Sequence, residues 1–260
     1  MKNNIQYITS KFFYNKNVKY GFFTRMGGVS KKPYNSLNCS LGTKDKKVDI
    51  KKNKLLAINQ LNFKEKILII GNQIHSNKVI IIKEYKKNIN LNGDGFITKN
   101  KKIILGILTA DCAPIFFYDE ITKTIAAAHA GWRGCFKNIC KSVVDKMNRI
   151  GCKTKNIQVI IGPCINSKNY EVDEKFYLKF IKKNKNYNKF FKYNKRKRNY
   201  RFDLSKTLKY QLKKLLIKKI VLKDIDTFSN YSKFFSHRRS IKQNNGLTGR
   251  MINIIGLIEN

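Results

Sequence analysis

Short apolar runs separated by polar stretches are the feature that most constrains the fold of this chain. Each run is four to six residues long, which is too short for an amphipathic helix and typical of a buried β-strand. We therefore expect strands at Lys66–Ile70, Lys78–Ile82, Ile103–Leu108, Ile115–Tyr118, Thr124–Ala128 and Ile157–Ile161.

Helical periodicity occurs between these runs. Apolar residues recur every three or four positions in Val48–Leu61, in Phe136–Met147 and from Leu204 to Leu215, where Asp203 or Ser205 provides an N-cap. Strands and helices alternate irregularly, and no Ser/Gly linker divides the 260 residues. We expect an α/β (α+β) fold, in which residues 1–260 form a single-domain sandwich of mixed β-sheets flanked by helices.

The chain lacks the usual membrane and export signals. No stretch of eighteen apolar residues occurs, and Met1–Tyr14 has neither a continuous apolar region nor a small-residue cleavage site. The sequence predicts a cytoplasmic protein without membrane contact. Its six cysteines form no CxxC pair, so we expect them to be free thiols.

The formal net charge of +39 invites a nucleic-acid interpretation, which we disfavour. Only nine of the 55 basic residues are Arg, the residue that usually forks onto phosphates and base edges. The abundance of Lys, Asn and Ile suggests compositional drift in an AT-biased genome. In either case the surface should attract anions, including phosphorylated substrates.

The strongest local shift in composition spans residues 182–201, where Lys, Asn, Arg and aromatic residues crowd together. We interpret this stretch as a basic solvated insertion or loop flanked by helices. The alternative is a nucleic-acid-binding arm whose stacking aromatics are Phe190, Phe191 and Tyr193.

Histidine is scarce, which narrows the candidates for chemistry. Only His75, His129 and His237 occur, and the first two follow predicted strands, as Cys112 does. Strand ends are where side chains converge on a cleft of an α/β sheet. Two imidazoles and one thiolate can hold zinc and leave its fourth position open, the pattern of a catalytic site. The spacing matches no compact zinc signature, so buried packing roles remain an alternative.

A nucleophilic interpretation uses the same residues. Cys112 would be a thiolate activated by His129 or His75, with Asp111 orienting the imidazole. The residues alone do not decide between these two schemes.

Several arginines stand in stretches that also contain glycine, serine or threonine. Gly131 and Gly134 flank Trp132 and Arg133 before a helix, either as an anion site or as a helix start with a packing Trp. Three further arginines occur in comparable stretches and could be surface charges: Arg25, Arg238 and Arg250.

Together these motifs resemble a known family. They are Phe23-Thr24-Arg25-Met26-Gly27-Gly28-Val29-Ser30, Gln73-Ile74-His75, Asp94-Gly95-Phe96-Ile97-Thr98, Thr109-Ala110-Asp111-Cys112-Ala113-Pro114, His129-Ala130-Gly131-Trp132-Arg133-Gly134, Ile161-Gly162-Pro163-Cys164-Ile165, Tyr170-Glu171-Val172 and Thr248-Gly249-Arg250. In this order they resemble the family labelled laccase-domain polyphenol oxidase, purine nucleoside phosphorylase or peptidoglycan editing factor.

The resemblance implies an α/β fold of sandwiched sheets, a homodimer, and a mononuclear zinc or copper site at His75, Cys112 and His129. It also implies phosphorolysis of adenosine, inosine and 5′-methylthioadenosine, with adenosine deamination as a side activity. Two places depart from the family pattern. Asp226 stands where the family usually has Cys, and the stretch Asn166–Asn169 is less typical.

Composition tests these labels. Multicopper oxidation needs further imidazoles, and only His237 remains after the proposed site is filled, so we reject it. Zinc is preferred, with copper as the alternative. For phosphorolysis, we expect Arg25, Arg133, Arg238 and Arg250 to bind phosphate. For deamination, Asp111 is our candidate proton carrier.

Two other functions stay open. The same metal or thiolate could hydrolyse an amide in a peptidoglycan precursor. A non-enzymatic chain could bind nucleic acid through Lys182–Arg201.

Overall fold

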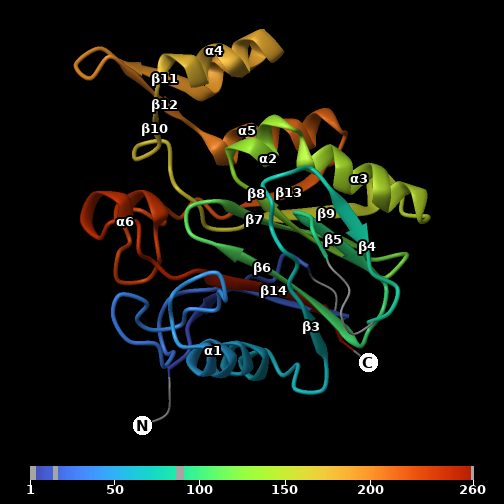
Figure 1. Ribbon diagram of the computed structural model, residues 1–260. Coiled ribbons are helices and arrows are strands. Elements are labelled where there is room, and N and C mark those ends of the chain that lie inside the picture. The colour runs from blue at the N-terminus through green and yellow to red at the C-terminus, as the bar shows by residue number, and fades with distance from the viewer. Residues whose placement is uncertain (1–3, 14–16, 86–90, 259–260) are drawn as a thin grey trace.

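The computed structural model describes residues 4–13, 17–85 and 91–258. Two large sheets lie face to face, and helices cover their outer faces (Figure 1). The five-stranded sheet has the order β1-β2-β14-β6-β3. Its strands are β1 (Tyr7–Ile8), β2 (Val18–Phe23), β3 (Ile67–Ile69), β6 (Ile103–Thr109) and β14 (Met251–Leu257).

The six-stranded sheet has the order β13-β9-β7-β8-β5-β4. Its strands are β4 (Val79–Ile81), β5 (Gly95–Thr98), β7 (Ala113–Asp119), β8 (Thr124–Ala130), β9 (Ile157–Ile161) and β13 (Lys219–Leu222). The helices are α1 (Lys47–Gln60), α2 (Trp132–Phe136), α3 (Ile139–Arg149), α4 (Glu174–Lys183), α5 (Leu204–Lys214) and α6 (His237–Gln243), with short 3-10 turns at Thr154–Asn156 and Lys185–Phe190.

Side chains alternate between the two faces of β7, so this strand contributes to two separate hydrophobic cores. Phe116 and Tyr118 point between the two sheets, where Phe116 stacks on Phe22 of β2 at 4.8 Å between ring centroids. Ile115 and Phe117 point to the opposite face. β7 is therefore apolar on both faces because a layer covers each of them.

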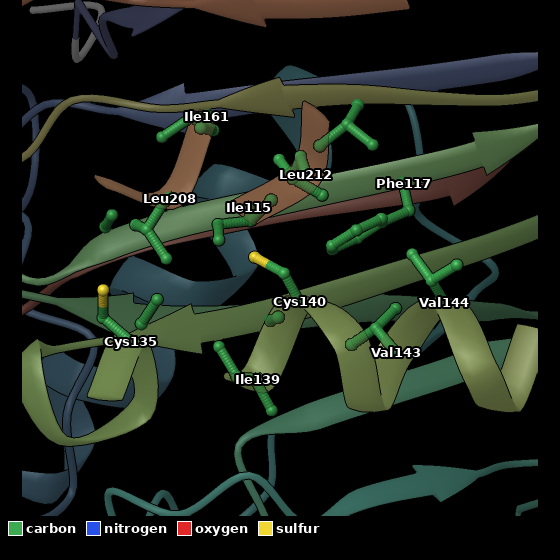
Figure 2. Packing of buried hydrophobic residues seen from close by; sticks show 14 of the residues in the cluster. Ile115, Phe117, Cys135, Ile139, Cys140, Val143, Val144, Ile161, Leu208 and Leu212 are labelled. Carbon is green, nitrogen blue, oxygen red and sulfur yellow. The ribbon is translucent and has the colours of Figure 1, made fainter. Parts of the chain in front are cut away.

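Helices α3 and α5 cover the outer face of the six-stranded sheet (Figures 1 and 2). Figure 2 shows Cys140 and Val143 of α3, together with Leu208 and Leu212 of α5, lying beside Ile115 and other residues of this sheet. Helix α1 covers the outer face of the five-stranded sheet, where Ala57 and Ile58 pack in a core of their own.

These elements confirm the expected fold class and the six predicted strands, with ends shifted by at most two residues. The third predicted helix is also confirmed, because the Asp203 side chain accepts a hydrogen bond from the N–H of Lys206 as N-cap of α5. The prediction of one helix over Phe136–Met147 is wrong at its start. Asn138 adopts a left-handed conformation (φ 61°), separates α2 from α3, and caps α3 through its side chain.

Residues 182–201, expected as a solvated insertion or loop, have regular structure. They contain the end of α4, a 3-10 turn and the hairpin of β11 (Phe191–Asn194) and β12 (Asn199–Phe202), which pairs with β10 (Glu171–Val172). Phe190 and Phe191 pack against the core, so of the three proposed stacking aromatics only Tyr193 is well exposed. This packing weakens the nucleic-acid alternative.

In the described ranges, no helix combines the length and apolar character that crossing a membrane requires.

Candidate metal centre

Three segments far apart in the sequence bring His75, Cys112 and His129 together. His75 lies in the loop after β3, Cys112 between β6 and β7, and His129 within β8. One ligand atom from each residue lies within 4.8 Å of the others, and the two imidazole centroids are 4.9 Å apart. The nitrogen and sulfur donors form a set that could hold a zinc or copper ion, with room left for a further ligand.

A buried carboxylate that the sequence analysis did not single out orients this trio. Asp94 accepts a hydrogen bond from His129 Nδ1 at 2.9 Å, which leaves Nε2 as the nitrogen available to a metal. Its two oxygens also accept the N–H groups of Ile74, His75 and Ser76 and the Ser76 hydroxyl. Asp94 therefore fixes both the tautomer of one candidate ligand and the loop that carries the other.

The two imidazoles have opposite proton affinities. Burial opposes charge on His129, but Cys112 and Asp94 outweigh that effect and raise the pKa of His129 to about 9. Burial, followed by the charge of His129, lowers the pKa of His75 below 6.5. His75 is thus neutral and ready to coordinate at pH 7, whereas a metal must displace the proton of His129.

The absence of a side chain at Gly131 leaves room for this arrangement. A Cβ atom there would lie 2.8 Å from Cys112 Sγ and 3.2 Å from His75 Nδ1. Gly131 has φ −77°, so its role is to provide space rather than an unusual backbone conformation. The glycine that the sequence suggested for an anion site instead lies against the candidate ligands.

The backbone beside the trio is strained. His75 and Asp111 both adopt left-handed conformations, with φ 54° and 85°, which non-glycine residues rarely do. Such strain persists only where surrounding contacts hold it, and it concentrates at functional sites. Here Asp94 holds the His75 loop, while donors from three residues hold Asp111.

A cavity of about 530 Å³ opens beside the trio. Lys54, His237 and Arg250 line it together with the three candidate ligands, and none of the acidic residues that the structure describes does. Burial lowers the pKa of both Lys54 and Arg250. The cavity is therefore suited to an anion.

Of the four arginines proposed to bind phosphate, only Arg250 lines this cavity. Arg25 lines a different one, Arg133 is exposed over the Trp132 ring, and Arg238 donates to the Glu171 carbonyl. Asp111, the candidate proton carrier, lies outside the cavity lining. Its carboxylate accepts the hydroxyls of Thr227 and Ser236 and the N–H of Arg238, so these contacts place it as an anchor for α6.

Lys54, His237 and Asp94 were not assigned to the site from the sequence. Lys54 is one of many lysines and gives no signal of its own. His237 could have been included on scarcity, since it is the one histidine outside the candidate ligands. Asp94 belongs to a quoted motif, but its function depends on a backbone path that spacing does not reveal.

Replacing Asp94 by asparagine should weaken zinc binding about 10- to 100-fold, the usual cost of losing a carboxylate behind a histidine ligand. Competitive titration against a chromophoric chelator measures this change. Asp119→Asn, at another buried carboxylate that caps a turn, is the control and should leave zinc affinity unchanged. Equal affinity in the Asp94 variant and the wild type would contradict the assigned role.

With the geometry established, comparisons place the chain among known proteins. The sequence profile of the family described as multi-copper polyphenol oxidoreductase laccase matches residues 19–258. The chain belongs to this family. Purine nucleoside phosphorylase YlmD of Bacillus subtilis is 32% identical over 257 residues, 94% of this chain and 90% of the relative. Purine nucleoside phosphorylase RP494 of Rickettsia prowazekii is 38% identical over 178 residues, 68% of this chain and 73% of the relative.

Solved structures of similar proteins share the laccase-family fold. The hypothetical protein YfiH of Bacillus licheniformis has a TM-score of 0.87 at 29% identity, covering 98% of this chain and 97% of that one. Protein NMB0706 of Neisseria meningitidis has a TM-score of 0.85 at 25% identity, covering 98% of this chain and all of that one. The family assignment and the mixed α/β architecture are thus confirmed.

The two places that depart from the family pattern lie in contact with each other. Asp226 accepts hydrogen bonds from the Asn166 N–H at 2.9 Å and from the Asn169 side-chain amide at 2.7 Å. It also accepts the N–H groups of Phe228 and Ser229. Burial alone would raise the pKa of Asp226, but hydrogen bonds from Ser229 and Asn166 outweigh it and hold the pKa below 3.8. The carboxylate therefore joins two loops.

Asp226→Asn should lower the free energy of unfolding by about 1–3 kcal/mol at pH 7, because donors around the lost carboxylate are left poorly paired. The folded-state pKa is depressed, so the stabilisation is present above pH 4 and is lost as pH falls through that pKa. Urea unfolding should show a smaller difference in free energy of unfolding between the variant and the wild type at pH 3 than at pH 7. Asp145→Asn, which removes an exposed ion pair, should change stability by only about 0.5 kcal/mol.

Proposed function

We propose that this protein is a metal-dependent purine nucleoside phosphorylase acting on adenosine, inosine and 5′-methylthioadenosine. One observation carries the proposal: the candidate metal ligands and an acid-free set of cationic groups line the same cavity of about 530 Å³. Phosphorolysis needs a phosphate site beside the nucleoside, and an electrophilic centre in the same pocket would stabilise charge that develops on the substrate. The names of the two curated relatives support the same reaction.

Phosphate binding is assigned to Arg250 and Lys54. Arg250 Nη1 donates to the carbonyls of Thr248 and Gly249 at 3.0 Å each, which orients the guanidinium. Both cations line the cavity, where partial burial strengthens their attraction to a phosphate dianion. These two side chains would hold the nucleophile, a phosphate oxygen, that attacks C1′ of the ribose.

The nucleoside also needs a site for its purine base, and apolar and amide groups of the same cavity provide it. Leu41, Ile70 and Leu108 line the cavity together with Asn72 and Gln73. The Gln73 side chain donates to the Leu108 carbonyl and accepts the Leu108 N–H, each at 2.8 Å, which ties the loop of His75 to β6. A flat base fits such a mixed lining.

We assign separate functions to residues of the chain. Arg250 and Lys54 bind and orient phosphate, and Asp111 positions α6 and therefore His237. When bound to His75, Cys112 and His129, a zinc or copper ion would act as a Lewis acid toward the substrate. In the bond exchange, the C1′–N bond breaks as the C1′–O bond forms, and the base leaves with the electron pair and takes up the proton that the attacking hydrogen phosphate loses.

The family label does not require multicopper oxidation. A chain with three histidines lacks the imidazoles for a trinuclear cluster once two of them bind a single ion. Zinc therefore remains our preferred metal, with copper as the alternative.

To test the proposal, protein of known metal content is incubated with adenosine, inosine or 5′-methylthioadenosine, each with and without phosphate, and the products are separated by chromatography. Adenine and ribose 1-phosphate, formed only with phosphate, are the expected products from adenosine. Inosine formed from adenosine without phosphate would reveal the deaminase activity. If all three nucleosides stay intact while an amide bond of a UDP-muramoyl-amino acid is cleaved, the editing function replaces this proposal.

A further inference from the structure

A second cation-rich cavity lies beside α6. It has a volume of about 330 Å³. Its lining consists of Arg25, Lys32 and Arg239, of hydroxyl- and amide-bearing side chains, and of Pro33 and Leu247, with no acidic residue from the described part of the chain. Helix α6 contributes to both cavities, His237 to the metal cavity and Arg239 to this one. The second cavity shares no lining residue with the first.

The two arginines are fixed in place by neutral groups. Arg25 donates to the Asn35 carbonyl, the Asn35 side-chain oxygen and the Tyr231 carbonyl, and its guanidinium lies 4.5 Å from the centroid of the Phe235 ring. Arg239 donates to the carbonyls of Thr227, Phe228 and Phe234. A guanidinium has five N–H donors, so each arginine keeps about two beyond these bonds.

Neither guanidinium forms an ion pair with a carboxylate in the described part of the chain. The acids that act on Arg239 over a distance, Asp111 and Asp226, use their oxygens for other donors. Burial and the charge of Arg239 lower the pKa of Arg25 to about 10. Two guanidinium groups held close, with no carboxylate in direct contact in the described residues, leave positive charge that an anion would neutralise.

We propose that this second cavity binds a phosphate group, either free phosphate or the phosphoryl group of a small metabolite, separately from the metal centre. Arginine pairs bind phosphate through charge-assisted, forked hydrogen bonds. The amino group of Lys32 adds a third positive charge. A volume of about 330 Å³ also accommodates a small body attached to the phosphate.

Equilibrium dialysis with radiolabelled inorganic phosphate, at fixed ionic strength, measures the bound phosphate per chain. Gln243→Glu places a carboxylate at the cavity edge, on the last residue of α6. It should weaken binding at this site about tenfold or more, because like charges repel. Gln60→Glu makes the same change on the last residue of α1, outside this cavity, and should bind phosphate as the wild type does.

Asn35→Asp provides a second route to the same result, since the new carboxylate would pair with Arg25. Asn59→Asp, at an exposed position on α1, is its control. Competition with ribose 5-phosphate distinguishes the two possible ligands. If ribose 5-phosphate binds more tightly than inorganic phosphate, the ligand is a phosphorylated metabolite, and if it binds more weakly, the ligand is free phosphate. Equal phosphate binding by all four variants and the wild type would overturn the site and leave only general attraction to a +39 chain.

This site and the proposed function can fail separately. If both are right, the wild type binds two phosphates and Gln243→Glu binds one while still cleaving adenosine. If the metal cavity binds no phosphate and phosphorolysis is absent, the wild type binds one phosphate at the second site and Gln243→Glu binds none. Two bound phosphates in Gln243→Glu overturn the second site whatever the enzyme assay shows.

Discussion

Cys112→Ala is expected to remove both zinc binding and nucleoside turnover. Cys112 Sγ is one of three donors within 4.8 Å of one another, and two imidazoles alone hold zinc far more weakly. Loss of a Lewis acid that contributes several kcal/mol lowers kcat/KM by about 10³-fold or more. Metal analysis by mass spectrometry and a phosphorolysis assay on the same preparation measure the two effects.

Cys152→Ala is the matched control, because Cys152 is a buried thiol that hydrogen-bonds with the Thr122 hydroxyl, away from the candidate ligands. It should retain metal and turnover at some cost in stability. Equal activity of Cys112→Ala and the wild type, at equal protein and known metal content, would remove the site from consideration.

Chelation separates the metal scheme from a Cys112 nucleophile. Both schemes predict that Cys112→Ala is inactive, so that variant does not distinguish them. Stripping the metal from wild-type protein should abolish turnover, and added zinc should restore it. Full activity in the metal-free protein, abolished by a thiol-alkylating reagent, would instead favour the nucleophile.

Part of each layer follows from local sequence patterns, although β2 and β14 of the five-stranded sheet lie outside the predicted strands. Runs such as Ile115–Tyr118 are short and apolar on both faces, and such runs become central strands when layers cover each side. The β11–β12 hairpin was missed because its strands are charged and only partly buried, so alternation gives little signal. The break at Asn138 was missed because a left-handed residue disrupts a helix without changing its periodicity.

The candidate site shows a similar division. His75 and His129 could be grouped with Cys112 because histidine is scarce in this chain and all three residues follow predicted strands. Arg25 could not be placed, since its distance from the metal cavity depends on how β2 pairs with β14 in the sheet. Long-range pairing of this kind leaves no trace in the residues near Arg25.

Like Cys112→Ala, Gly131→Ala should have a large effect. We expect it to abolish metal binding in a protein that remains folded. The new Cβ would lie 2.8 Å from Cys112 Sγ, closer than Cβ atoms pack, and 3.2 Å from His75 Nδ1, a tight contact that requires a small shift. Without metal, both side chains can move aside, so stability should change little. With metal, they cannot move without leaving the ion.

Where zinc is still bound, a displacement of about 1 Å at the reacting centre costs about 10²-fold in rate, so we expect kcat/KM to fall by at least that order. Gly42→Ala is the control: Gly42 lines the same cavity, and its added Cβ would meet Ser40 Oγ at an ordinary 3.5 Å. Full zinc occupancy and activity in Gly131→Ala would show that the ligands meet elsewhere. Because the substitution leaves all three donors in the chain, its effect tests their geometry rather than their chemistry.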